Sequence, residues 1–261
     1  MKCRVITNKQ LNPRYYKLTV LAKEIADQAQ PGQFVMLQVN SGFDPLLRRP
    51  FAIHRWWDGG EIEILYQIAG KGTRLLSQLC AGAVVDILGP LGKGFSLPLT
   101  GVRPFLLVAG SIGVAPLLPL AQDLISKQVL TPNQITLLAG GKSQADILAV
   151  QEFGDLGVRV KICTEDGSFG QKGLVTDLLA PLLQTAPSPV FACGPTGMLK
   201  AVAELCRQYQ TPCQVSLEAA MACGVGACQG CVVKTQAEHA DFKFQRVCCE
   251  GPVFEAEKVI W

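Results

Sequence analysis

The chain has 261 residues, of which 49% are hydrophobic and 17% are charged, and its formal net charge is +3. This length suits two domains, or two domains with a small appendage, and the composition excludes a disordered chain. Arg and Lys are scattered, so no basic patch indicates nucleic-acid binding. The two histidines, His54 and His239, lie far apart in the sequence and offer little for a histidine-based metal site.

The first region, residues 1–99, is predicted to form a small antiparallel β barrel. Short β-branched or alternating runs follow one another closely, separated by turns rich in Pro, Gly and Asp. The expected strands are Arg4–Thr7, Tyr15–Leu21, Phe34–Val39, Phe51–Arg55, Glu61–Gln67 and Val84–Leu88. One helix is expected over Arg74–Leu79.

Two segments of the barrel could hold phosphate. Arg48-Arg49-Pro50-Phe51-Ala52 offers a bidentate guanidinium fork. A solvated basic turn is the alternative, because it would have the same sequence pattern. Gly70-Lys71-Gly72-Thr73, just before the expected helix, is a second candidate cradle. His54 is expected to be a surface histidine or a satisfied barrel histidine rather than a catalyst.

The second region, residues 100–210, is predicted to form a doubly wound parallel sheet. A continuous apolar strand is followed by a glycine turn and a helix, and the pattern then repeats. The expected strands are Phe105–Ala109, Ile135–Ala139, Val158–Cys163 and Val190–Cys193, with helices ending near Lys127 and Tyr209. Ligands bind such sheets at the carboxyl ends of the strands, where these glycine turns lie.

Two glycine turns of this sheet are candidate nucleotide sites. Gly110-Ser111-Ile112-Gly113 follows an apolar strand, and its N–H groups could hold a pyrophosphate at a helix N-terminus. It is not a complete dinucleotide fingerprint, so an ordinary strand–helix turn remains an alternative. Cys193-Gly194-Pro195 follows another strand, where the glycine would admit a nicotinamide ring and Pro195 suits the first turn of a helix.

A third stretch, Pro104–Gln122, has no charged residue and could be mistaken for a membrane span. Its glycines and prolines divide it into a strand, a turn and a helix start, so no membrane span is expected. The segment Met1–Arg4 lacks the apolar run of a signal peptide. Eleven cysteines, an odd number, then favour a reducing compartment such as the cytoplasm and a metal centre over a disulfide framework.

The last region, residues 211–261, is predicted to be a small module organised by a metal centre. Cys223-x4-Cys228-x2-Cys231 has the spacing of plant-type 2Fe–2S ferredoxins, and the pair Cys248-Cys249 follows. Glycines at 224, 226 and 230 would let the backbone approach the sulfurs. Zinc, core cysteines or a disulfide are alternatives, but zinc sites usually show two separated cysteine pairs. Spacing alone does not choose between Cys248 and Cys249.

The order of barrel, nucleotide sheet and iron–sulfur module resembles the ferredoxin–NADP reductase superfamily. Over almost its full length, the chain is similar to the electron-transfer subunits of NAD-dependent (class 1B) dihydroorotate dehydrogenases of Gram-positive bacteria. The segments that carry this resemblance are Pro31-Gly32-Gln33-Phe34, Leu46-Leu47-Arg48-Arg49-Pro50, the run from Gly89 to Phe95, Asp166-Gly167-Ser168 with Gly170, Cys193-Gly194-Pro195 with Met198-Leu199-Lys200, Met221-Ala222-Cys223-Gly224 and Gly251-Pro252-Val253-Phe254.

The resemblance implies FAD in the barrel, NAD on the sheet and a 2Fe–2S cluster in the C-terminal module. By motif, it implies FAD contacts at Arg49, Pro50, Phe51, Ala52, Leu65, Tyr66, Gln67, Gly72 and Thr73. It implies cluster ligands at Cys223, Cys228, Cys231 and Cys248, the last because the family's cysteine stands three residues before the Gly-Pro-Val-Phe glycine. For NAD, the candidates stay Gly110, Gly113, Cys193, Gly194 and Pro195.

Some positions depart from the family pattern. Ala52 stands in place of a serine or threonine whose hydroxyl could bond the flavin, and Gln67 stands where arginine is common. The turn from Gly110 to Pro116 differs from the usual Gly-Gly-Gly-x-Gly-Val-Pro-Pro, and Ala219-Ala220 stands where charged residues are typical. These departures bear on affinity and flavin potential.

The resemblance implies an oxidoreductase subunit of pyrimidine biosynthesis with a catalytic, FMN-containing partner, in two copies of each subunit. Electrons from dihydroorotate would pass from FMN through the cluster and FAD to NAD. The chain has no region left for a dihydroorotate site, and no side-chain acid or base is assigned. A reductase subunit of a sulfide dehydrogenase or hydrogenase-type complex is an alternative, as is a zinc-stapled nucleotide-binding regulator.

Overall fold

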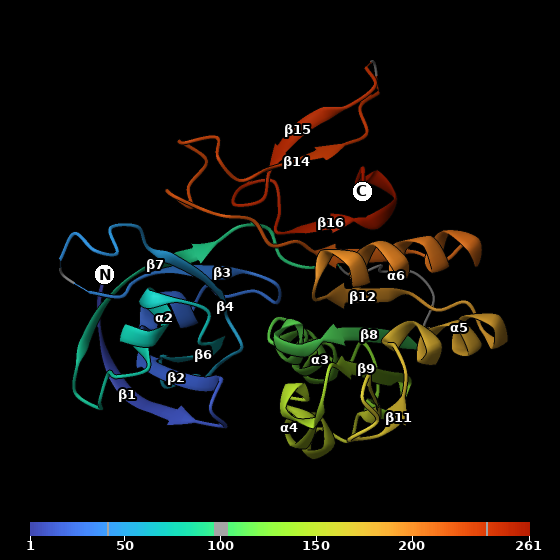
Figure 1. Cartoon of the computed structure of the whole chain (residues 1–261), viewed down its shortest axis with the longest axis horizontal. Helices are drawn as coiled ribbons and strands as arrows, with labels where there is room; N and C mark the ends of the chain where they lie inside the picture. The colour runs from blue at the N-terminus through green and yellow to red at the C-terminus, as the bar shows by residue number, and fades with distance from the viewer. Residues whose placement is uncertain (41, 97–103, 239) are drawn as a thin grey trace.

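The computed structural model describes residues 1–40, 42–96, 104–238 and 240–261. Two seven-stranded sheets form the body, and a two-stranded ribbon projects above them (Figure 1). The expected boundary between residues 99 and 100 and the side chain of His239 lie outside the described residues.

The first sheet is antiparallel and closes into the expected barrel. Its strand order is β4-β3-β7-β1-β2-β6-β5, so the consecutive strands β4 and β5 lie at opposite edges. The strands are β1 (Lys2–Gln10), β2 (Tyr15–Leu21), β3 (Phe34–Gln38), β4 (Arg49–Ala52), β5 (Arg55–Trp56), β6 (Glu61–Gln67) and β7 (Val84–Leu91), with helices α1 (Lys23–Ala26) and α2 (Lys71–Leu76). Alternate inward side chains such as Leu18, Val20, Ile62 and Ile64 fill the barrel core.

Two expectations for the barrel were wrong in detail. The single strand expected over Phe51–Arg55 is split, because Ile53 and His54 carry the chain from one sheet edge to the other. The Ile53 N–H donates to the Gln33 carbonyl and the His54 N–H donates to the Glu63 carbonyl, which closes the barrel. The expected helix over Arg74–Leu79 begins earlier, at Lys71, because Thr73 caps the preceding turn through its hydroxyl.

The second sheet confirms the doubly wound arrangement. Its order is β11-β10-β9-β8-β12-β13-β16, and every neighbouring pair is parallel except β13 with β16. The strands are β8 (Phe105–Gly110), β9 (Ile135–Gly141), β10 (Arg159–Thr164), β11 (Gln171–Lys172), β12 (Val190–Cys193), β13 (Cys213–Ser216) and β16 (Val253–Glu255). The direction of strand order reverses between β8 and β12, so a ligand crevice is expected there.

Helices cover both faces of this sheet (Figure 1). Buried side chains of α3 and α4 pack on one face, and those of α5 and α6 pack on the other. The helices are α3 (Leu117–Ser126), α4 (Val150–Asp155), α5 (Val175–Thr185) and α6 (Thr196–Gln208), with short 3-10 turns η1 (Ser111–Val114), η2 (Pro132–Gln134), η3 (Gln144–Asp146) and η4 (Ala256–Lys258). The uncharged stretch from Pro104 is therefore strand, turn and helix, as expected.

The C-terminal segment is tied to the second sheet at both ends. It leaves the sheet after β13, forms the cysteine loop and the ribbon of β14 (Val232–Thr235) and β15 (Lys243–Arg246), and returns as β16. The sequence did not predict β13 or β16, which are short. Across the described parts of the chain, none of the helices is both long and apolar enough to span a membrane.

Candidate cofactor and electron-transfer site

A cavity of about 590 Å³ lies where the barrel meets the second sheet and the start of the cysteine loop. It brings together most of the residues expected to contact flavin. Those that line it are Arg49, Pro50, Phe51, Ala52, Leu65, Tyr66, Gln67 and Thr73, together with Cys193 from the nucleotide sheet. Ala219 and Ala220, two of the departures from the family pattern, also form its wall.

The two adjacent arginines of the barrel motif have different surroundings. Arg48 is occupied by Asp86, with Nη2 to Oδ1 at 2.7 Å and Nη1 to the backbone carbonyl at 2.8 Å. The Asp86 side chain is 22% exposed, and the hydrogen bonds from Arg48 and Lys2 outweigh the effect of its burial and lower its pKa. Arg49 makes no ion pair among the described residues and lines the cavity. Arg49 is therefore the guanidinium available for a flavin phosphate.

The remaining barrel candidates form walls around this arginine. Gly72 does not line the cavity but packs under Arg49, where an added Cβ would meet Nε at 3.2 Å. Thr73 is in the first turn of α2, and its hydroxyl accepts hydrogen bonds from the backbone N–H groups of Ala69 and Gly70. The Tyr66 hydroxyl donates to Asn8 Oδ1 at 3.0 Å, and burial raises the pKa of this phenol. These contacts hold the aromatic wall rigid.

A second cavity of about 640 Å³ opens at the carboxyl ends of β8, β9, β10 and β12. Gly110 and Gly194 line it at the point where the strand order reverses, and Pro195 lies beside them. A Cβ on Gly194, whose φ is +156°, would meet the Gly110 backbone at 3.0 Å. The two turns therefore pack against each other, and glycine is needed for this close approach.

The other two nucleotide candidates are placed differently. Gly113 does not face the cavity, because its Cα packs directly against the carbonyl of Cys193. Cys193 is buried and lines the flavin cavity, and burial raises the pKa of its thiol to about 12. Pro195 directly precedes α6 rather than lying in its first turn.

The flavin and nucleotide cavities are neighbours. Gln67, Ile112 and Glu218 line both of them. Glu218 is exposed to solvent through these cavities, while the surrounding protein raises the pKa of its carboxyl by desolvation. Ligands that fill the two cavities would therefore meet at these three side chains.

The cysteine loop has the local geometry of a thiolate site. The Cys223 sulfur accepts hydrogen bonds from the backbone N–H groups of Val225 and Cys228, both at 3.4 Å. Led by the bond from Cys228, these bonds lower the pKa of Cys223 to about 6. Gly224, with φ +72°, packs so closely on Met36 that a Cβ would lie 2.5 Å from Met36 Cγ. The loop therefore exposes N–H donors to sulfur, as an iron–sulfur cluster requires.

The predicted ligands form two pairs. The Cys228 thiol is near enough to Cys223 to help lower its pKa, and the Cys231 thiol is near enough to Cys248 to help raise the pKa of that thiol. Within the ranges that the structure describes, no three His, Cys, Asp or Glu side chains converge on a single metal point. A mononuclear zinc site needs four ligands around one ion, whereas two irons divide four thiolates into pairs. The two pairs of predicted ligands correspond to the division of four thiolates between two irons.

The fourth ligand lies next to a competitor. Cys248 and Cys249 sulfurs are 3.7 Å apart. Cys248 is buried, and burial followed by its contact with Cys231 raises the pKa of its thiol to about 12. Cys249 instead packs against Gly226, where a Cβ would lie 2.6 Å from its sulfur. These contacts favour Cys248 as the fourth ligand.

Close backbone contacts join the cysteine module to the barrel. The Lys93 N–H donates to the Gly251 carbonyl at 2.6 Å. Gly92, with φ +76°, packs on Pro252, where a Cβ would lie 2.6 Å from Cδ. Met221, two residues before Cys223, lines the flavin cavity. The cysteine loop therefore lies directly beside the flavin site.

Polar side chains join the barrel to the nucleotide sheet, and the sequence did not reveal them. His54 is fully buried, and its Nδ1 lies 3.0 Å from the Ala115 carbonyl of the second sheet region. Burial lowers its pKa to about 3, so it is neutral. Lys17 forms an ion pair with Glu152 of α4. Neither residue has a sequence signal, because each contact depends on how the two regions dock.

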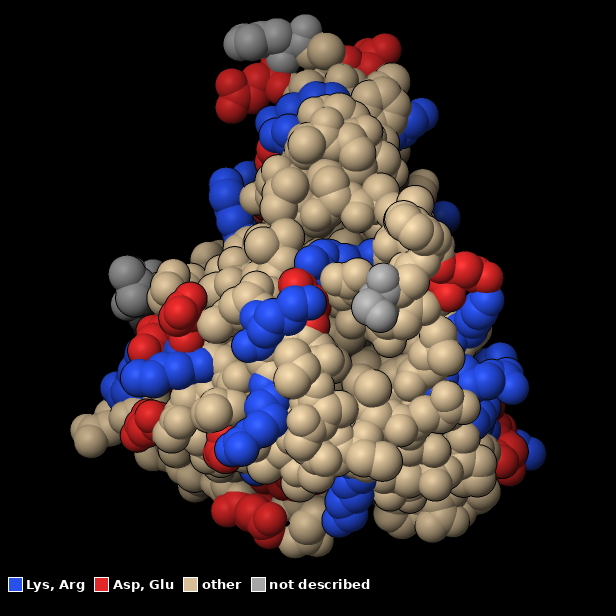
Figure 2. Space-filling view, turned by 90° about the vertical axis from the view of Figure 1, so that its left-hand side faces the viewer, with Lys and Arg blue, Asp and Glu red and all other residues tan. Residues whose placement is uncertain are grey.

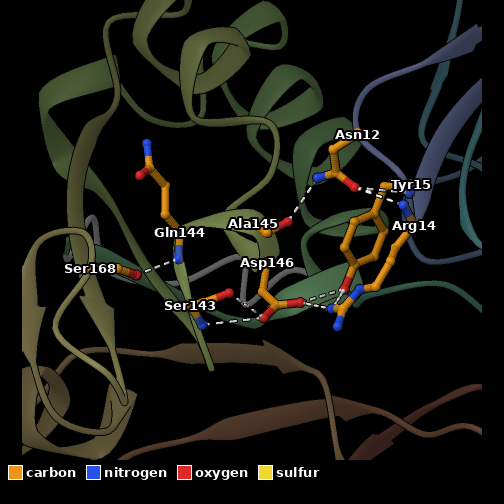
Figure 3. Close-up of polar contacts among 8 residues, drawn as sticks. All are labelled: Asn12, Arg14, Tyr15, Ser143, Gln144, Ala145, Asp146 and Ser168. Atoms are coloured by element: carbon orange, nitrogen blue, oxygen red, sulfur yellow. Dashed lines mark hydrogen bonds and ion pairs between the residues drawn. The ribbon is translucent and has the colours of Figure 1, made fainter.

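Figure 3 shows a third polar contact, at the rim of the nucleotide cavity. Asp146 of η3 is buried and accepts hydrogen bonds from Arg14 and, at 2.8 Å, from the Tyr15 hydroxyl. Asn12 Nδ2 donates to the Ala145 carbonyl at 2.9 Å. The turn between β1 and β2 therefore holds the segment that follows β9.

Comparisons with known proteins agree with this layout. Residues 218–260 match the family described as the iron-sulfur cluster binding domain of dihydroorotate dehydrogenase B, and residues 107–204 match the oxidoreductase NAD-binding domain. The chain is 38% identical to the dihydroorotate dehydrogenase B (NAD(+)) electron transfer subunit of Desulforamulus reducens, covering 99% of this chain and 97% of the relative. The chain belongs to this family of electron transfer subunits.

Further relatives support the family and the fold. The electron transfer subunit of Caldanaerobacter subterraneus subsp. tengcongensis is 39% identical, covering 100% of this chain and 98% of that one. The solved structure of an NADH-dependent reduced ferredoxin-NADP oxidoreductase aligns with a TM-score of 0.86 and 27% identity, over 99% of this chain and 90% of that one. A ferredoxin NADP+ reductase from Neisseria gonorrhoeae with bound FAD and NADP, at 15% identity and a TM-score of 0.68, covers 80% of this chain and 91% of that one, and shows the fold alone.

As a member of this family, the chain is an oxidoreductase subunit with FAD, a 2Fe–2S cluster and NAD as its cofactors. An electron transfer subunit also implies a catalytic partner subunit. The alternatives of a zinc-stapled regulator and of a sulfide dehydrogenase or hydrogenase-type reductase gain no support from these matches.

Proposed function

We propose that this chain carries electrons from an FMN-containing catalytic subunit of dihydroorotate dehydrogenase to NAD. The observation that carries the proposal is the order of three adjoining sites. Glu218 lines both the flavin and the nucleotide cavities, and Met221 extends the flavin cavity to within two residues of Cys223. A one-electron centre, a flavin and a nicotinamide would then lie one after another, in the order that electron transfer from the partner to NAD requires.

The chain's own residues would bind and orient these cofactors. When bound, FAD supplies exchange between hydride transfer and single-electron steps, and the cluster supplies single-electron transfer. The flavin set is Arg49, Pro50, Phe51, Ala52, Leu65, Tyr66, Gln67, Gly72 and Thr73. The NAD set is Gly110, Gly113, Cys193, Gly194 and Pro195, and the cluster set is Cys223, Cys228, Cys231 and Cys248. No side-chain acid or base takes part.

The surface around the cysteine loop suits a protein partner. Residues 219–233 contain no Asp, Glu, Lys or Arg. Val225, within this stretch, is 49% exposed. Figure 2 shows few charged atoms in the middle of the column that the cysteine module forms on this side. The cores of protein–protein interfaces are depleted of charged residues. The catalytic subunit would therefore dock on this uncharged surface.

The test is reconstitution with the separately purified catalytic subunit. Mixing the two should enable NAD reduction that depends on dihydroorotate. The Cys223→Ser variant should abolish this activity while reducing NADH oxidation by ferricyanide much less, because ferricyanide can take electrons from flavin. NAD reduction that persists without the cluster would overturn the proposed route.

Two finer statements belong to the same proposal. The complex would hold two copies of each subunit, and native mass spectrometry would contradict this by finding any other ratio. The chain would work in the cytoplasm, because none of its eleven cysteines forms a disulfide and reactive thiolates need a reducing compartment. Fractionation that found it in an oxidising compartment would contradict this.

A further inference from the structure

The nucleotide cavity requires positive charge that the second sheet supplies only sparingly. A dinucleotide carries two negative phosphates, yet three carboxylates, those of Asp146, Glu165 and Glu218, line the cavity. The cationic side chains that line it are Arg14 and Lys142. One of these two, Arg14, comes from the barrel rather than from the sheet.

The helix ends around the cavity supply little of this charge. The glycine turn after β8 continues as the four-residue η1, and α3 begins only at Leu117. At the start of α5, the Leu174 N–H is already bonded, because Asp177 Oδ2 accepts its hydrogen bond at 2.7 Å. The start of α6 at Thr196 also borders the cavity, but a helix N-terminus carries only about half a unit of positive charge. Two phosphates beside three carboxylates therefore call for a side-chain cation as well.

Arg14 is a cation held in a fixed position with donors to spare. Its Nη2 donates to Asp146 Oδ1 and, at 3.0 Å, to the Tyr15 hydroxyl, and its guanidinium lies 5.3 Å from the centre of the Tyr15 ring. Among the described residues, Nε and Nη1 have no hydrogen-bond partner. Half of the side chain is exposed at the cavity rim.

We propose that Arg14 binds a phosphate oxygen of the NAD pyrophosphate through its unused N–H groups, and that Asp146 and Tyr15 are positioning residues for it. The inference rests on the proposed use of NAD and deepens it. Arginine suits this role because its planar fork donates two parallel hydrogen bonds to phosphate. The nucleotide site is then shared between the sheet and the barrel, whose contact through Arg14 and Asp146 is drawn in Figure 3.

The test compares Arg14→Ala with Asn12→Ala in the flavin- and cluster-loaded chain. Both variants remove a hydrogen bond between the same turn and the segment after β9, but only the first removes a cation. The measurements are the KM and kcat for NADH with ferricyanide as acceptor and the Kd for ADP-ribose. Arg14→Ala should raise KM and Kd about tenfold, with kcat and flavin content unchanged. Arg14→Lys should lie between it and the unaltered chain.

The control and the salt dependence separate binding from scaffolding. Asn12→Ala should stay within about twofold of the unaltered chain, because it keeps the charge. Rising ionic strength should weaken ADP-ribose binding more in the unaltered chain than in Arg14→Ala. Equal losses in both variants, or no loss in Arg14→Ala, would overturn the proposal. An unaltered chain that binds ADP-ribose but cannot oxidise NADH would instead contradict the proposed function.

Discussion

The barrel makes two contacts of opposite character. Beside apolar packing, its contact with the nucleotide sheet includes polar side chains, namely the pairs Arg14–Asp146 and Lys17–Glu152 and the His54–Ala115 bond. Its contact with the cysteine module depends on backbone and glycine packing, at Gly92 on Pro252 and at Gly224 on Met36. Polar side-chain contacts tolerate small displacements, whereas close-packed backbone does not.

The difference matches what each contact encloses. The polar contact borders the nucleotide cavity, which NAD must enter and leave at every turnover. The close-packed contact borders the flavin cavity and the cysteine loop, whose cofactors remain bound. Each of the following predictions disturbs one contact and leaves the other as an internal control.

The largest expected effect is loss of the cluster. Cys248→Ser should lose iron and acid-labile sulfide completely, because a hydroxyl replaces the thiolate that lies next to Cys231. Cys249→Ser should keep most of both. NADH oxidation by ferricyanide should survive in both variants, because the nucleotide contact is untouched. The reverse pattern of iron content would make Cys249 the ligand.

The next effect is a break in the close-packed contact. Gly92→Ala should lower the free energy of unfolding by about 2–4 kcal/mol, since it adds left-handed strain to a clash with Pro252. Gly82→Ala is the matched control, because its φ is also positive, at +88°, but a Cβ there meets nothing within 4 Å. It should cost only about 1 kcal/mol. Equal losses in chemical denaturation would show that strain, not packing, dominates.

The flavin cavity, where both contacts meet, gives the third prediction. Arg49→Ala should weaken FAD binding about ten- to hundredfold, because a charge-assisted phosphate contact contributes about 1.5–3 kcal/mol. Arg48→Ala should change FAD affinity little, because Arg48 is bound to Asp86. Fluorescence titration of the deflavinated chain measures both. Unchanged affinity in the Arg49 variant would remove it from the flavin site.

The smallest effect concerns the polar contact and pH. Because burial lowers the folded-state pKa of His54 to about 3, the unfolded chain takes up a proton first, near pH 6.5. His54 therefore contributes stability above pH 6.5 that is lost progressively as pH falls toward 3. Between pH 7 and pH 5 the loss should be about 1–2 kcal/mol. Lys17, Arg55 and Glu63 surround the ring and do not change this sign.

His54→Gln provides the comparison for this pH dependence. Glutamine keeps a donor for the Ala115 carbonyl but does not titrate. Urea unfolding of this variant at the two pH values should show a smaller difference than the unaltered chain. An identical difference would mean that other groups account for the acid sensitivity.

Sequence patterns identified the elements whose formation depends on residues close together in the chain. Both bounds of the strand Val190–Cys193 were predicted correctly, because a buried parallel strand is a continuous apolar run bounded by Pro and Gly. The Arg49–Ala52 motif was likewise found, and the structure brings it into the cavity with Leu65 and Tyr66. In both cases the signal lies within a few neighbouring residues.

Features that depend on distant partners were not visible. His54 and Ala115 are 61 positions apart, and Tyr15 and Asp146 are 131 positions apart. Neither pair has a pattern of its own, since the contacts exist only once the two sheets dock. The split between β4 and β5 was missed for the same reason, because closing the barrel sets it.

The return of the chain as β16 also bears on how the protein is made. Val253–Glu255 pairs with β13 and covers the edge of the sheet that β13 would otherwise leave open. On the ribosome, every cysteine of the loop emerges before this strand does. The cluster site is therefore anchored at both ends only after Val253–Glu255 have been synthesised. Iron–sulfur assembly would then act on a chain that already extends past β16, and a chain truncated before Val253 would be unable to hold its cluster loop in place.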